Sequence, residues 1–376
     1  MEKYSEKLLQ YIVTDPVECD LWYKARHYVL NIMPPLDGAG IGPDSGKRVH
    51  VVVNGSSPLM MAVVRQICLL THYPNFDEET GRNRTLITIS DDDAHKAYNA
   101  LKTTRFLGAL LDYCHCTVDG RTMKNSEKDL PLDIEFQFVT HKSDIEDADA
   151  VIDSKDVEAK AIAYKTEIDV TKGMLINMVY NTGAEIDNLP ASDNANISRY
   201  TTALNVFCYH LKTGHILEKW GGITKPDAAG NYNLLEVKNK LSSVFCADCL
   251  EGRVRGMMGA TATKVSEYSD LEFKELKSKI SDVNTLIAQA KSEHARWNVE
   301  KIIMGFRPLG QADWYSLETC FGAERKQRIK SLKKRGIHID LCSYKDLRRI
   351  DPGCMKYDYF IMLAMPYILR TPTSLQ

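Results

Sequence analysis

Three side chains near the carboxyl end of the chain combine an imidazole, an indole and an ammonium group on one predicted helix. His294, Trp297 and Lys301 are three and four residues apart, so a helix over 292–304 places them on one face. Gly305 follows, and a glycine in the left-handed conformation commonly ends a helix. Because an aromatic face can stack on a base and a cation can hold a phosphate, this face predicts a site for a nucleotide-derived ligand.

Further aromatic and basic side chains follow this helix. Phe306 and Arg307 come directly after the glycine, and His338 and Tyr344 lie further along the chain. We include all four in the predicted ligand site. The alternative is a structural role, since an indole on an apolar helix face is usually core, a lysine can extend past it, and a buried histidine can simply be hydrogen-bonded.

A second candidate site is the turn after the first predicted strand. In a dinucleotide-binding fold, glycines in this turn let backbone amides approach a pyrophosphate. Gly55 is the only glycine of that motif here, because Ser57 and Met60 fill its other two positions. The same residues also fit a helix that is capped by serine and binds no cofactor, so both interpretations stay open.

Two carboxylates end the second predicted strand. Asp91 and Asp92 occupy the place where an acidic residue would bind the ribose of a nucleotide, although an acidic start is also favourable for a helix. The predicted cofactor site therefore consists of Gly55, Ser56, Ser57, Asp91 and Asp92.

The segments around this turn predict alternating strands and helices. β-Branched runs over 49–53 and 85–90 are each followed by an apolar helical pattern, and further apolar runs cover 132–140, 150–152 and 174–180. Strands separated by helices favour a parallel sheet. The expected fold class is therefore α/β, with a degenerate, doubly wound Rossmann-like parallel sheet followed by a mostly α-helical domain.

Helical patterns occupy both ends of the chain. Residues 1–33 predict one or two helices, and the second half includes a long charged helix over 270–304 and a last helix over 357–369. Nothing in the sequence between these parts indicates a role for 216–265. We divide the chain into a helical arm, a Rossmann-like domain, a helical connector and a C-terminal domain, at 1–45, 46–215, 216–284 and 285–376.

The C-terminal domain resembles the ryanodine-receptor (RyR) repeat domain. The family pattern H-x-x-W-x-x-x-K-x-x-x-G-[WF] matches the residues from His294 to Phe306, and H-x-x-L-x-x-[YF] matches those from His338 to Tyr344. A closing Tyr-Asp pair before an apolar helix matches Tyr357 and the residues after it. The resemblance implies a ligand-binding domain built around these residues.

Three positions depart from the RyR pattern. Phe306 stands in place of the more usual tryptophan, Pro308-Leu309-Gly310 in place of a tyrosine–glycine turn, and Ile339 in place of a proline. These departures concern the shape of the pocket more than the fold.

Residues 46–215 resemble the nucleotide-binding TrkA-N domain of Trk-type potassium-transport regulators, in topology more than in motif. Some bacterial proteins join such a domain to a C-terminal RyR repeat, and this chain resembles them. That resemblance implies a role in nucleotide signalling, defence or the regulation of ion transport.

Composition gives no support for several other classes of protein. The chain has 376 residues and is 44% hydrophobic, which is enough for a sizeable core. Its net charge of -2 creates no field that would attract nucleic acid or anionic lipid, so we do not expect a nucleic-acid partner. The apolar runs are too short to cross a bilayer and the first residues are charged, so we expect a cytoplasmic protein without membrane insertion.

The ten cysteines are scattered, as is typical of reduced, buried thiols in an intracellular protein. Cys246 and Cys249 have half of a zinc-site spacing, and Cys114-His115-Cys116 offers three possible ligands. A structural zinc site needs four ligands, so we expect buried cysteines and no metal.

These observations predict a regulatory or sensor protein that binds a nucleotide or an NAD-derived ligand through its RyR-like domain. The chain has no G-x-S-x-G, P-loop or H-E-x-x-H motif, so we name no catalytic residue. Two alternatives remain: an NAD(P)-dependent oxidoreductase that uses the Rossmann-like half, and a scaffold for protein–protein interactions. The long helix over 270–304 could carry a dimer contact, which makes a homo-oligomer a further expectation.

Overall fold

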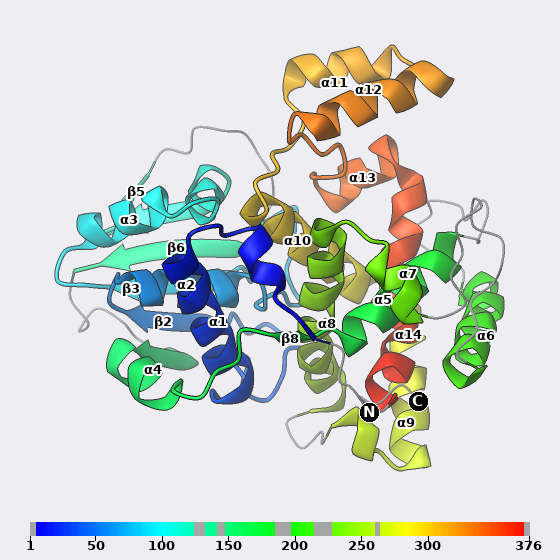
Figure 1. Ribbon diagram of the computed structural model, residues 1–376, viewed down its shortest axis with the longest axis horizontal. Coiled ribbons are helices and arrows are strands. Elements are labelled where there is room, and N and C mark those ends of the chain that lie inside the picture. The colour runs from blue at the N-terminus through cyan, green and yellow to red at the C-terminus, as the bar shows by residue number, and fades with distance from the viewer. Residues whose placement is uncertain are drawn as a thin grey trace.

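A sheet lies on one side of the molecule and a group of helices on the other (Figure 1). The computed structural model describes residues 5–123, 132–140, 147–184, 197–213, 228–259 and 264–371. The predicted α/β class is confirmed in this coarse form, because the main sheet is mostly parallel and the C-terminal half is helical.

The main sheet contains six strands in the order β5-β4-β6-β3-β2-β7. Every neighbouring pair is parallel except β4 and β5. After β6 the chain passes β3 and β2 and adds β7 at the far edge, so the direction of strand addition reverses beside β2. The strands are β2 (His50–Asn54), β3 (Thr85–Ser90), β4 (His115–Val118), β5 (Arg121–Thr122), β6 (Ile134–Val139) and β7 (Ala150–Asp153).

The central strands are buried on both faces, which explains their unbroken apolar runs. Val51, Val52 and Val53 of β2 are all buried, as expected for a parallel strand that is covered by helices on each side. Helix α2 (Pro58–Cys68) follows β2 and is buried along its length because α1 (Pro16–Asn31) packs against it.

The predicted strand over 174–180 is wrong, because these residues form part of helix α5 (Thr171–Ala184). Helix α5 packs against α8 (Val237–Met258) and α14 (Met355–Arg370), and it is apolar on several sides. A helix that is buried all round gives the same short apolar run as a buried strand, so periodicity alone does not separate them.

The predicted long helix over 270–304 is also wrong in one respect, since it is two helices. Helix α9 (Asp270–Ile280) ends at Ser281, and α10 (Val283–Ile303) begins after Asp282. The Asp282 carboxylate accepts a hydrogen bond from the Thr285 backbone N–H at 2.9 Å, which starts a new helix.

The remaining helices complete both halves of the molecule. Helices α11 (Gln311–Glu318) and α12 (Gly322–Lys334) form a hairpin at one edge of the molecule (Figure 1). None of the helices in the described residues combines the length and the apolar character that crossing a bilayer requires. The remaining elements are β1 (Ser5–Glu6), η1 (Leu8–Tyr11), α3 (Ala94–Thr103), η2 (Leu107–Asp112), α4 (Ser154–Lys160), β8 (Ile168–Asp169), α6 (Ile197–Thr213), α7 (Ala228–Asn233), η4 (Val265–Glu267), α13 (Tyr344–Ile350) and η5 (Pro352–Cys354).

Helix α10 belongs to two hydrophobic cores. Its second half contributes Val299 and Ile302 to the core that contains the sheet, and its first half contributes Leu286 and Ala290 to a core formed mainly by helices. The predicted boundary at residue 215 lies outside the described residues, and the boundary between 284 and 285 falls in the first turn of α10. The two halves of the molecule therefore meet along this helix.

Gly305 has the left-handed conformation that its position predicts, with φ at +86°. A Cβ atom there would also lie 2.7 Å from the ring of Phe106. We expect Gly305→Ala to lower the free energy of unfolding by at least about 1–2 kcal/mol, the cost of a left-handed alanine. Urea denaturation measures this change. Gly310→Ala is the control, since a Cβ there meets nothing within 4 Å, and equal losses in both variants would contradict the prediction.

Candidate functional site

All but one of the predicted residues of the C-terminal site meet in the structure. The ring of His294 stacks on Trp297 with the centroids 6.0 Å apart, and Trp297 meets His338 edge to face at 4.8 Å. The Nζ of Lys301 lies 5.3 Å from the indole centroid, in a cation–π contact. We term these residues the ring cluster: His294, Trp297, Lys301, Phe306, His338 and Tyr344.

A short parallel bridge brings the two parts of the ring cluster together. Gly305 turns the chain out of α10, and the Arg307 backbone N–H then donates to the Gly336 carbonyl at 2.9 Å. The His338 N–H donates back to the Arg307 carbonyl at 3.1 Å, which carries the His338 ring against α10. The Arg307 side chain is exposed and takes no part in the ring cluster.

The ring cluster is packed rather than open. His294 is 4% exposed and Lys301 is 5% exposed, and each has a partner inside the protein. The Nε2 of His294 lies 2.9 Å from the Cys342 carbonyl oxygen, and Lys301 donates to the Glu300 carboxylate at 2.7 Å. These contacts indicate that most residues of the ring cluster have a structural role and pack within the protein.

A row of buried charged residues lies on α10, the helix that carries His294, Trp297 and Lys301. Arg296 is fully buried and binds Glu293 at 2.8 Å and Glu300 at 2.5 Å, at helical spacings of three and four. Arg253 of α8 donates to Glu293 at 2.9 Å, and Lys301 completes the row. Burial opposes ionisation of Glu293, but the two arginines outweigh it and lower the pKa of its carboxyl. We term this set the α10 ion network.

A cavity of about 640 Å³ lies against the ring cluster, on the side of His294 and Tyr344. One wall comes from α10 and α13, and the other from the segment that precedes β3 in the sheet half. We term it the α10–α13 cavity. It is lined by Pro43, Tyr73, Pro74, Asn75, Phe76, Asp77, Glu78, Glu79, Ala288, Lys291, Ser292, His294, Ala295, Asn298, Tyr344, Lys345 and Arg348.

The acidic groups of this cavity have partners within the protein. The Glu78 carboxylate accepts the Tyr344 backbone N–H at 2.7 Å, and burial raises the pKa of Glu78. Asp77 binds Thr80 of its own loop. The cavity also contains Asn298, whose Oδ1 is buried without a hydrogen-bond partner among the described residues. A polar ligand could supply that missing donor.

Sequence reasoning missed the residues that line this cavity beside His294. Lys291 and Asn298 lie three residues before and four residues after it, so the spacing of one helix face could have found them. Arg348 lies four residues after Tyr344 in the same way. Glu78 gives no such signal, because it lies in a loop that precedes β3 and reaches α13 only in the folded chain.

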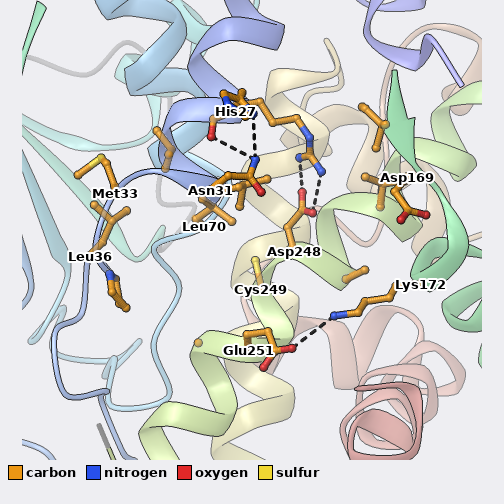
Figure 2. A pocket seen from close by; sticks show the side chains of 18 of the residues that line it. His27, Asn31, Met33, Leu36, Leu70, Asp169, Lys172, Asp248, Cys249 and Glu251 are labelled. Carbon is orange, nitrogen blue, oxygen red and sulfur yellow. Dashed lines mark hydrogen bonds and ion pairs between the residues drawn. The ribbon is translucent and has the colours of Figure 1, made fainter. Parts of the chain in front are cut away.

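A second cavity, of about 730 Å³, lies between α1, α5 and α8 and contains none of the predicted site residues. Leu36 lies on one side of it and Lys172 on the other (Figure 2). Its charged groups are largely paired with each other: Arg26 binds Asp248, and Lys172 binds Glu251 at 3.3 Å.

The residues of the predicted cofactor site lie close to one another, but their side chains interact with neighbouring groups of the protein. The Asp91 carboxylate accepts the Asp92 backbone N–H at 2.7 Å and lies close to Ser56, and although burial opposes ionisation, its interactions with Ser56 and Asp92 lower the pKa of Asp91. Ser57 caps α2 by accepting the Met60 N–H. Gly55 has φ at +100°.

The arrangement of this turn fits the capped-helix interpretation, because Ser57 caps α2 and the Asp91 carboxylate lies beside Ser56, where a phosphate would bind. Asp92 is exposed. Neither cavity is lined by Gly55, Ser56, Ser57, Asp91 or Asp92. Cofactor binding at the turn stays a prediction.

Comparison of the chain with protein-family models, with curated proteins and with solved structures found no match. The resemblance to the RyR repeat and to the TrkA-N domain therefore stays a prediction.

Removal of Arg296 should destabilise the protein strongly. Arg296→Met leaves Glu293 and Glu300 buried with one partner fewer, and we expect the free energy of unfolding to fall by about 3–5 kcal/mol. The control is Lys291→Met, since Lys291 is exposed on the same helix and its replacement should change stability by less than about 0.5 kcal/mol. Urea denaturation compares the two, and a small loss for Arg296→Met would contradict the role of the α10 ion network.

The buried His294 should make the protein less stable in acid. Burial lowers the pKa of His294 to about 4, so between pH 6.5 and 4 the unfolded state binds a proton that the folded state does not. The stability contribution is complete above pH 6.5 and falls by up to about 1.4 kcal/mol per pH unit below it. His294→Gln should remove the His294 share of the slope between pH 6 and 5 in denaturation experiments, and His338, whose pKa burial lowers to about 2, should keep its own share. His95→Gln, at an exposed position, should keep the wild-type slope.

Proposed function

We propose that this protein is a non-catalytic, cytoplasmic sensor that binds a nucleotide-derived anion in the α10–α13 cavity. The observation that carries the proposal is the combination of cations and aromatic faces in one cavity whose walls come from both halves of the chain. Its volume of about 640 Å³ lies in the range of small-molecule sites.

The lining groups suit the two parts of such a ligand. Lys291, Lys345 and Arg348 supply positive charge, and arginine in particular can hold two phosphate oxygens at once. Phe76 and Tyr73 supply ring faces on which a base can stack. The unpartnered Oδ1 of Asn298 would accept a hydrogen bond from a base amino group or a ribose hydroxyl.

The same cavity offers a route for a signal between the halves. Glu78 already joins the loop before β3 to the start of α13 through the Tyr344 N–H. A ligand that contacts this loop and α13 together would stabilise the arrangement in which both are in place, since binding to one conformation shifts the population towards it. The sensor would thus couple the sheet half to the helical half.

We further propose the family assignment that the sequence predicts. The reversal of strand order beside β2 and the Gly55 turn support a degenerate Rossmann-like domain of the TrkA-N type. The meeting of His294, Trp297 and His338 supports an RyR-like C-terminal domain, because these are the residues of the family pattern. In this assignment the RyR-like domain holds the ligand, and Asp91 fills the ancestral phosphate turn.

Thermal unfolding of the purified protein in the presence of ADP-ribose, NAD, cyclic AMP or ATP tests the proposal. A ligand at 100 times its dissociation constant adds about 2.7 kcal/mol of stability, which raises the midpoint of unfolding. Arg348→Ala should abolish that rise. The matched control is Arg349→Ala, because Arg349 lies outside the cavity and stacks on Trp314 at 4.2 Å, and its loss should leave the rise unchanged.

Three results would speak against the α10–α13 cavity as a nucleotide site. The absence of a rise with all four ligands would reject the sensor. A rise that survives Arg348→Ala would place the ligand elsewhere. If NAD binding persisted in that variant but was lost in Gly55→Asp, the Rossmann-like turn would be the site and the oxidoreductase alternative would gain support.

A further inference from the structure

Three side chains that commonly bind metals meet around α13. Asp340 precedes the helix, and Asp351 and Cys354 follow it, yet one ligand atom of each lies within 4.8 Å of the others. Asp351 and Cys354 are three residues apart across the 3₁₀ turn η5, in which side chains at that spacing lie one above the other. The fold thus gathers two carboxylates and a thiol from both ends of α13.

One oxygen of the buried Asp340 carboxylate has no hydrogen-bond donor among the described residues. Asp340 is 8% exposed, and its Oδ1 has no hydrogen-bond partner in the described part of the chain. The Oδ2 accepts a weak hydrogen bond from the Cys354 thiol, and the Nδ1 of His338 lies 3.6 Å from it, beyond hydrogen-bond distance. Within the described residues, no lysine or arginine forms an ion pair with Asp340 or Asp351. Against the effect of burial, Lys333 lowers the pKa of Asp340 from a distance but forms no ion pair with it, and a buried carboxylate oxygen without a donor is costly.

The distance between two of these groups matches a zinc site. In a tetrahedral site with Zn–S about 2.3 Å and Zn–O about 2.0 Å, a sulfur and an oxygen ligand lie about 3.5 Å apart. The Sγ of Cys354 and the Oδ2 of Asp340 are 3.7 Å apart. Only small side-chain movements separate this pair from the required geometry.

We propose that Asp340, Asp351 and Cys354 bind a divalent transition metal of the zinc type, with water as the fourth ligand. The thiolate selects such a metal over Mg²⁺ or Ca²⁺, which prefer oxygen ligands alone. Binding releases the Cys354 thiol proton to solvent and gives the Asp340 Oδ1 an adjacent positive charge. Asp351 and Cys354 are partly exposed, so the metal and the water can enter from solvent.

His338 is the nearest other candidate ligand, but it is already engaged. Its Nδ1 lies 3.6 Å from the Asp340 Oδ2 and 3.4 Å from the Asp340 backbone N–H, which points a donor at the nitrogen lone pair. Its ring also packs against Trp297. The metal therefore leaves the ring cluster intact and acts on α13, whose start and end it joins.

Cobalt titration of the full chain tests this site. The purified protein is stripped with a chelator and titrated with Co²⁺, which replaces zinc and gives a near-ultraviolet band when a thiolate binds it. We expect one equivalent of Co²⁺ per chain with that band, and its displacement by Zn²⁺. Cys354→Ser should lose the band, and Asp351→Asn should bind Co²⁺ about tenfold more weakly or worse. Cys320→Ser is the matched control, since its thiol lies beside Glu324 instead, and it should keep the wild-type titration.

Two results would overturn the metal site: no thiolate band in the wild-type protein at one equivalent, or an unchanged band and affinity in Cys354→Ser. Circular dichroism of each stripped variant checks that it is folded. If Cys354→Ser does not fold, Asp351→Asn decides, and wild-type affinity in that variant overturns the site. The titration contains no nucleotide, so this result and that for the α10–α13 cavity are independent.

Discussion

The buried ion network of α10 is the constraint on which the site depends. Arg296 is fully enclosed, and its charge is tolerable only because Glu293 and Glu300 lie one helical turn before and after it. Arg253 ties the same network to α8. Because each charge needs its partner, α10 has one acceptable rotation about its axis. That rotation also decides which side chains face the ring cluster and which face the cavity.

Because α10 lies between two hydrophobic cores, the constraint on its orientation affects both halves of the molecule. One end of the helix packs against the sheet half and the other end against the helical half, so a change in its orientation would disturb the packing of both. Ser292 on the same helix donates to the His72 carbonyl at 3.0 Å, next to a buried pair between His72 and Asp133. The α10–α13 cavity beside His294 therefore has the fixed helix α10 on one side and the loop before β3 on the other.

Much of the fold and part of the site could be predicted from the sequence, for identifiable reasons. The β-branched run of β2 and the helical spacing of His294, Trp297 and Lys301 are local patterns, and each appears in the structure as a strand and as one helix face. The run over 174–180 was ambiguous because burial on all sides removes periodicity. The break at Asp282 was hidden because one capping carboxylate was enough to divide a charged helical pattern.

The sequence by itself determined which residues can share a helix face, where Gly305 ends α10, and that the chain forms an α/β protein. The tertiary structure alone decided that Lys301 pairs with Glu300 inside the protein and that the Asp91 carboxylate lies beside Ser56. It also decided that the cavity uses Glu78 and Arg348 from distant segments. The physical reason is range: spacing along the chain governs contacts within one element, whereas burial and charge pairing depend on which elements pack together.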